Sequence, residues 1–200
     1  MTQSRYRLLL VAIGLAALVV GWYSAGQLQS RAGDRGLEGF GGDFTLQSAD
    51  GPVSLSDYRG QAVALYFGYA SCPDVCPVSL ANMATAFQRL PPEARDRVQG
   101  IFISVDPERD TPQVLAEYAQ AFHPDIVGVT GPIPELQKVS RQYGAIFAKV
   151  EMEDSAMGYA MDHSSVIYVV RPDGVVHSLV QHGTPPAEIA GSLQEALRAG

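Results

Sequence analysis

The chain has two cysteines, Cys72 and Cys76, within the segment CPDVCP at residues 72–77. Side chains at positions i and i+4 lie on one face of a helical turn, so two thiolates at this spacing can converge on one metal ion. Their Cα atoms would be roughly 6 Å apart, within the range of about 4.4–6.8 Å that a disulfide bridges. The spacing therefore predicts a metal clamp, a thiol–disulfide switch, or both.

Cys76 has two interpretations. It belongs to the apolar stripe of a helix predicted to follow the pair, and a cysteine there can be a small buried hydrophobic residue. The pair is also flanked by Pro73 and Pro77 and lies at the predicted helix start, where the helix N-terminus lowers the pKa of a thiol. These features favour a functional pair of thiolates.

A third ligand would come from one of four histidines. His123 ends a predicted helix, where a cation or a cap is the ordinary role. His177 alternates with apolar residues in a predicted strand and is expected to face solvent. His163 stands directly before a predicted buried strand, and His182 lies beside a glycine in a loop. Spacing alone leaves open His163, His182 or no histidine ligand.

Bulk properties exclude some classes of protein. The formal net charge is -7 and the isoelectric point is near 5.0, so no basic surface is available to neutralise nucleic-acid phosphates. Two cysteines cannot form a disulfide-stapled mini-fold, so a hydrophobic core must hold the domain together.

The N-terminal segment predicts export. Arg5 and Arg7 precede an apolar run at residues 8–20, and no further charge occurs before Arg31. Such a span can cross a hydrocarbon core of about 30 Å, and the arginines place its start in the cytoplasm. We expect an uncleaved transmembrane anchor over residues 1–26; the alternative is a signal peptide cleaved near residues 24–26.

Beyond the anchor, the sequence predicts a flexible tether over residues 27–42 and one α/β domain over residues 43–200. Apolar runs that indicate buried strands alternate with helical patterns, and a polar loop is expected over residues 151–162. The order predicts a thioredoxin-like architecture, with a mixed, mainly parallel sheet flanked by helices. The cysteine loop and the loop at residues 106–110 are expected at the carboxyl edge of the strands.

Three segments resemble the SCO/SenC family: GYASCPDVCP at residues 68–77, SVDPERDTP at 104–112 and YAMDHS at 159–164. The resemblance covers nearly all of residues 43–179. It implies a membrane-anchored copper chaperone, not an enzyme, whose Cu(I) and Cu(II) ligands fall on Cys72, Cys76 and His163. The family often has Thr-His where this chain has Ala70-Ser71, a difference that removes no ligand.

The resemblance also implies the setting. The expected acceptor is the CuA site on the copper-binding subunit of cytochrome c oxidase, and the expected location is the periplasmic side of the inner membrane. A copper donor and an exported thiol reductase would act first, because an oxidised pair cannot bind copper as thiolates do. The alternative function is an exported thiol–disulfide oxidoreductase or redox sensor that uses Cys72 and Cys76.

The sequence indicates no single role for Arg109 or for three methionines. Arg109, in the loop at residues 106–110, is expected to act near the metal ligands or in docking, if it is more than a loop residue. The thioethers of Met152, Met157 and Met161 can bind Cu(I), although methionines in a polar loop are usually apolar filler.

Overall fold

A computed structural model describes residues 21, 37, 39–152 and 158–200 of the chain. Apart from Gly21, the predicted anchor lies outside the described residues, as does most of the predicted tether. In the part of the chain that is described, no helix is long and apolar enough to span a membrane. The last residues of the predicted tether already contact the domain, because the Gly41 amide donates to the Gln142 carbonyl at 2.7 Å.

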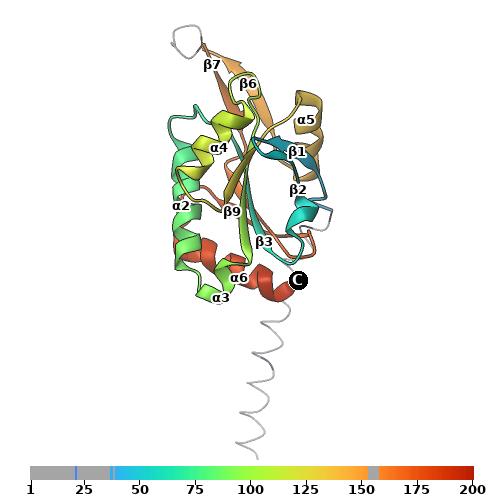
Figure 1. Cartoon of the computed structure of the whole chain (residues 1–200), viewed down its shortest axis with the longest axis vertical. Helices are drawn as coiled ribbons and strands as arrows, with labels where there is room; N and C mark the ends of the chain where they lie inside the picture. Colours follow the sequence, from blue (N-terminus) through green and yellow to red (C-terminus); the bar gives the residue numbers. More distant parts are fainter. Residues whose placement is uncertain (1–20, 22–36, 38, 153–157) are drawn as a thin grey trace, which may run out of the picture. The chain divides into compact units, whose positions relative to one another are not determined.

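The core is a five-stranded sheet that contains β3 and β9 (Figure 1), and its strand order is β5-β4-β3-β8-β9. Two long apolar strands form its centre, β3 (Ala62–Gly68) and β4 (Val98–Ser104). The remaining strands are β5 (Ile126–Val129), β8 (Val166–Val170) and β9 (Val176–Gln181). The mixed sheet is confirmed, but β3–β4 and β4–β5 are parallel while β3–β8 and β8–β9 are antiparallel. The prediction of a mainly parallel sheet is therefore wrong. The C-terminal strands β8 and β9 form a hairpin, and this hairpin joins the sheet antiparallel to β3.

Helices cover both faces of this sheet, as predicted. Neighbouring residues of β3 point to opposite faces. At Gly68 a side chain would meet the Cys76 sulfur of α2 (Val75–Arg89), so this face carries α2. The ring of Phe67 points the other way and packs on Tyr143, at the end of α5 (Ile133–Gln142).

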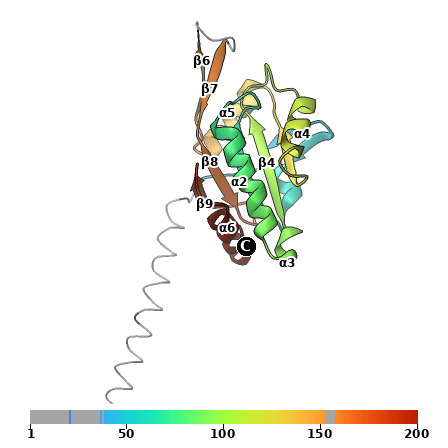
Figure 2. The same cartoon turned by 90° about the vertical axis from the view of Figure 1, so that its left-hand side faces the viewer.

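The other helices alternate with the strands, as the sequence predicts. α4 (Pro112–Gln120) connects β4 to β5, begins with a Thr111 cap and Pro112, and contacts β5. α6 (Pro186–Ala199) lies beside α2 (Figure 2). Two short helices, η1 (Leu55–Tyr58) and α3 (Pro92–Arg95), complete the helices found in residues 39–152 and 158–200.

Two hairpins stand outside the main sheet. One, near the start of the domain, consists of β1 (Thr45–Ser48) and β2 (Gly51–Ser54). The second, β6 (Phe147–Glu151) with β7 (Tyr159–His163), extends past the end of the sheet (Figures 1 and 2). The predicted loop over residues 151–162 is therefore wrong at Glu151 and at Tyr159–Asp162, where β6 and β7 pair although the local sequence shows no strand pattern.

Candidate metal centre

Three side chains from distant parts of the chain meet at the carboxyl edge of the sheet. Cys72 lies in the loop after β3, Cys76 in the first turn of α2, and His163 at the end of β7. Their Sγ, Sγ and Nε2 or Nδ1 atoms all lie within 4.8 Å of one another. Both cysteines are buried and free, with Cys76 fully enclosed. The structure thus brings together the three residues that the resemblance implied.

The cysteines do not share one helical turn, contrary to the simple spacing argument. α2 begins at Val75, so Cys72 precedes the helix and only Cys76 belongs to it. Proline has no amide N–H and is tolerated only in the first turn of a helix, where amides lack an intrahelical acceptor. Starting α2 at Val75 places Pro77 in that turn. The loop then folds back, with the Cys72 amide donating to the Tyr69 carbonyl at 3.3 Å.

Gly68 leaves space for the Cys76 sulfur at the end of β3. A Cβ atom added at Gly68 would lie 2.7 Å from Cys76 Sγ and 2.9 Å from the ring of Phe102. A real Cβ cannot approach so closely without displacing one of them. The glycine before the cysteine loop is thus a packing requirement of the site.

Burial sets the resting protonation of Cys76 and His163. Desolvation raises the pKa of the Cys76 thiol well above its ordinary value. This reverses the expected lowering by the helix N-terminus, because loss of water outweighs the field of the helix end. Burial also lowers the pKa of His163 and favours its neutral imidazole.

The neighbours of His163 favour one tautomer. Nδ1 lies 3.3 Å from the Ser164 carbonyl oxygen, which can only accept, so this contact favours the proton on Nδ1. In that tautomer the lone pair of Nε2 faces Cys76 Sγ, 3.3 Å away. The rings of Tyr66 and Tyr69 meet the imidazole edge-on, with centroids at 6.0 and 5.8 Å. This neutral, oriented imidazole is suited to donate Nε2 to a metal.

The free energy of unfolding of the reduced, metal-free protein is expected to fall as pH rises above about 8.5, the ordinary thiol pKa. There the unfolded chain ionises Cys76, while burial keeps it protonated in the folded protein. The Cys76 contribution is complete below that pH and declines by up to about 1.4 kcal/mol per pH unit above it. Urea unfolding between pH 7.5 and 9.5 measures this slope. An equal slope in Cys76→Ser would contradict the assignment.

The other histidines have structural partners away from the cysteines. His182 Nδ1 lies 3.0 Å from Ser79 Oγ, His123 packs edge-on against Phe87, and His177 lies near Glu195. Among the described His, Cys, Asp and Glu residues, only the Cys72–Cys76–His163 group has converging metal-ligand atoms. Spacing alone does not exclude His182 as a ligand, but in the structure its imidazole bonds Ser79 on α2.

The loop at residues 106–110 reaches the expected edge. Asp110 is buried, and its Oδ2 accepts hydrogen bonds from the Ala70 amide at 2.8 Å and from Ser104 Oγ at 2.5 Å. Burial raises the pKa of Asp110 above its ordinary value. Arg109 instead contacts Tyr159 on the hairpin that carries His163. The sequence motif singled out Arg109 but gave no sign of Tyr159.

The predicted methionines separate in the structure. Met161 is buried on β7, whereas Met152 is 41% exposed beyond the end of β6. Met157 lies outside the described residues. Their suggested contact with copper stays a prediction.

A hollow next to the candidate centre opens along the hairpin. It has a volume of about 290 Å³ and is lined by Ile146, Phe147, Ala148, Asp162, His163 and Ser164. Ile146 is 76% exposed. The imidazole can thus be approached from outside the domain.

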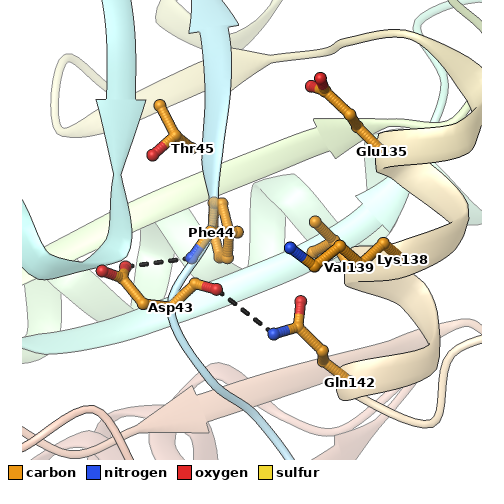
Figure 3. A pocket seen from close by; sticks show the side chains of 7 residues that line it. All are labelled: Asp43, Phe44, Thr45, Glu135, Lys138, Val139 and Gln142. Atoms are coloured by element: carbon orange, nitrogen blue, oxygen red, sulfur yellow. Dashed lines mark hydrogen bonds between the residues drawn. The ribbon is translucent and has the colours of Figure 1, made fainter.

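A separate hollow of about 360 Å³ lies between β1 and α5 (Figure 3). Its walls include Asp43, Lys138 and Gln142, and Gln142 donates to the Asp43 carbonyl at 3.3 Å. It contains neither cysteine nor His163. Its polar groups join the start of the domain to α5, and none of its lining residues belongs to the candidate metal centre.

The chain matches the SCO1/SenC family over residues 32–198. One relative, the mitochondrial protein SCO2 homolog of Bos taurus, is 38% identical over 160 residues. The alignment covers 79% of this chain and 60% of the bovine protein, so the chain spans less than two thirds of that relative.

Solved structures agree with this match. The copper-bound structure of Arabidopsis thaliana ScoI has a TM-score of 0.73 at 35% identity and covers 80% of this chain and 99% of its own. BsSco, a member of the Sco family of cytochrome c oxidase assembly proteins with an identified disulfide switch, has a TM-score of 0.64 at 27% identity. That comparison covers 81% of this chain and 96% of BsSco.

Proposed function

The chain belongs to the SCO1/SenC family, and from that premise we propose that it is a copper chaperone that binds Cu(I) and Cu(II) through Cys72, Cys76 and His163. It would deliver copper to, or mature, the CuA site of cytochrome c oxidase. The observation that carries the proposal is the convergence of two thiols and one imidazole within 4.8 Å. The copper-bound ScoI structure supports the choice of metal.

The donor set suits copper as cargo. Thiolates are soft ligands that select Cu(I), while imidazole also suits Cu(II). Two thiolates and a neutral imidazole carry a charge of about -2, so the loaded site would be -1 with Cu(I) and neutral with Cu(II). Structural zinc usually takes four ligands, and the described His, Cys, Asp and Glu residues offer three in this group.

Binding would require Cys76 to release its proton. Burial holds that thiol protonated in the metal-free protein, and metal charge supplies the compensation that the apolar surroundings lack. His163 needs no such step because burial favours its neutral form. The site would therefore exchange protons for copper, whose charge offsets one of the two thiolates as Cu(I) and both as Cu(II).

Three protein ligands leave copper open to a thiolate from the acceptor. The hollow beside His163 gives a route of approach, and the imidazole is the ligand that leaves without carrying charge. Transfer would proceed by ligand exchange: an acceptor thiolate bonds to copper as Nε2 departs, and the two cysteine sulfurs follow. We propose this order of ligand exchange, and we propose that the domain that carries the site is thioredoxin-like.

The setting is part of the proposal. The predicted anchor over residues 1–26 would hold the domain on the periplasmic side of the inner membrane, beside the oxidase. There, a copper donor and an exported thiol reductase would act on Cys72 and Cys76 before delivery. The description of BsSco as a cytochrome c oxidase assembly protein supports this acceptor.

A second candidate function is thiol–disulfide exchange. Cys72 and Cys76 are free and neighbouring, and BsSco has a disulfide switch. That function needs both cysteines but not His163. The burial of both thiols and the raised pKa of Cys76 disfavour a thiolate that attacks a substrate disulfide.

X-ray absorption of the reduced full chain loaded with one equivalent of Cu(I) separates the two functions. We expect two sulfur neighbours and one nitrogen neighbour in the wild type, and loss of the nitrogen in His163→Ala. His182→Ala is the matched control, because that imidazole bonds Ser79 on α2. A nitrogen retained in His163→Ala, or lost in His182→Ala, would reject the ligand set.

A further inference from the structure

The loop at residues 106–110 is attached to both halves of the candidate metal centre. On the cysteine side, Asp110 accepts the Ala70 amide, two residues before Cys72. On the histidine side, Asp106 accepts a hydrogen bond from Tyr159 Oη at 2.8 Å, on the strand that ends at His163. The loop therefore ties the two sources of ligands to one rigid support.

Arg109 strengthens the attachment to the hairpin. Its Nε donates to Asp106 Oδ2, and its Nη1 donates to the Tyr159 carbonyl at 3.2 Å. Its guanidinium carbon lies 3.8 Å from the centroid of the Tyr159 ring, a close cation–π contact. Tyr159 is thus held at its ring, hydroxyl and backbone carbonyl.

The geometry connects this attachment to the imidazole. Tyr159 and His163 lie four residues apart on β7 and point to the same face of the hairpin. Arg109 also lies 5.6 Å from the ring centroid of Tyr69, and that ring contacts His163 edge-on. A shift of the guanidinium would therefore reach His163 along the strand and through the aromatic ring.

The hairpin depends on such contacts for its orientation. β6 and β7 form a two-stranded sheet separate from the main sheet. An isolated pair of strands is only marginally stable in water and has no ladder to fix its angle to the domain. Arg109 Nη2 is buried without a hydrogen-bond partner among the described residues. Burying this unpaired nitrogen destabilises the folded protein, so stability alone does not explain the placement of Arg109.

We propose that Tyr159, clamped by Arg109 and Asp106, is a positioning residue that holds His163 at the metal and favours retention of Cu(II) over Cu(I). This inference rests on the proposed copper function. Two thiolates alone satisfy soft Cu(I), whereas Cu(II) prefers nitrogen and oxygen ligands and depends more on the imidazole. Loosening the clamp would therefore weaken Cu(II) binding selectively.

The test measures Cu(I) and Cu(II) affinities of the reduced full chain by competition with chelators, together with the electron paramagnetic resonance spectrum of the Cu(II) form. Tyr159→Leu removes the ring and the hydroxyl, Tyr159→Phe only the hydroxyl, and Arg109→Lys the planar clamp. We expect Tyr159→Leu and Arg109→Lys to weaken Cu(II) binding by about 10–100-fold, the usual effect of losing support for a ligand. Tyr159→Phe should weaken Cu(II) binding less. In all three variants the Cu(I) affinity should change by less than about threefold, because two thiolates satisfy Cu(I).

Two controls separate positioning from general damage. Arg95→Lys alters a guanidinium that likewise bonds backbone carbonyls, those of Gln88 and Leu90, and should leave both affinities unchanged. In a His163→Ala background, Tyr159→Leu should have no further effect on Cu(II) binding, because residues that act through one another are not additive. In the electron paramagnetic resonance spectrum of Cu(II), nitrogen hyperfine coupling should weaken in the Tyr159→Leu single variant.

Three results would overturn the inference: unchanged Cu(II) affinity and spectrum in both Tyr159→Leu and Arg109→Lys, equal losses for Cu(I) and Cu(II), or additive losses with His163→Ala. Each leaves the copper function intact if the wild type still binds copper and His163→Ala weakens it. Failure of the wild type to bind copper would reject the proposed function itself.

Discussion

Replacing Cys76 by serine is expected to abolish copper binding at neutral pH, with an affinity loss greater than about 100-fold. Outer partners of metal ligands already contribute 10–100-fold, and Cys76 would contribute a ligand atom itself. A serine hydroxyl is a hard, protonated donor that cannot replace a thiolate for Cu(I). Cys72→Ser should have a comparable effect, because either change leaves only one sulfur and the imidazole of the converging group.

Competition with a chromophoric Cu(I) chelator measures this loss on the reduced full chain. Ser79→Ala is the control on the same helix, since Ser79 is buried one turn after Cys76 and bonds His182. It should bind copper as the wild type does. Wild-type affinity in either cysteine variant would show that copper, if bound, occupies another site.

Oxidation of the cysteine pair should also prevent copper loading, again by more than about 100-fold, since both metal-binding thiolates are lost together. Joining the two sulfurs at about 2.05 Å removes two thiol protons and two electrons. The resulting disulfide has no thiolate to bind Cu(I). Reduction by a dithiol returns both protons and electrons and should restore loading.

Equilibrium dialysis against Cu(I) under anaerobic conditions measures loading of the oxidised and the re-reduced full chain, with free thiols counted in both. His163→Ala is an informative partner, because its thiols should oxidise and re-reduce as in the wild type despite weakened copper binding. Equal loading of the oxidised and reduced wild type would contradict the need for a reductase.

The strands of the central sheet could be predicted because their sequences admit little else. Residues 62–67 and 101–103 are continuous apolar runs, and every residue of β3 is buried in the structure. Thr111 followed by Pro112 likewise predicts the start of a helix. In the structure the Thr111 side chain accepts the Val114 amide, as a cap does. These elements could be predicted because residues close together in the sequence determine them.

The remaining parts depend on partners far along the chain. β7 is a strand because β6 pairs with it, and no pattern within Tyr159–His163 requires that. The clamp on Tyr159 involves a contact across 50 residues with Arg109. Likewise, the protonation of Cys76 follows from burial by the whole fold, although its position beside a helix start suggested the opposite. The choice of His163 over His182 required either the family resemblance or the fold.

The 87-residue separation of Cys76 and His163 has a consequence for folding. An ion bound to both would close a long loop between α2 and the hairpin, with the topology of a removable cross-link. A permanent link of that length is worth about 4–5 kcal/mol in chain entropy. A ligand at a thousandfold excess over its Kd gives about 4 kcal/mol through mass action. Bound copper would thus stabilise the fold only while it is held, and the free energy of unfolding of the protein would fall each time it releases the ion.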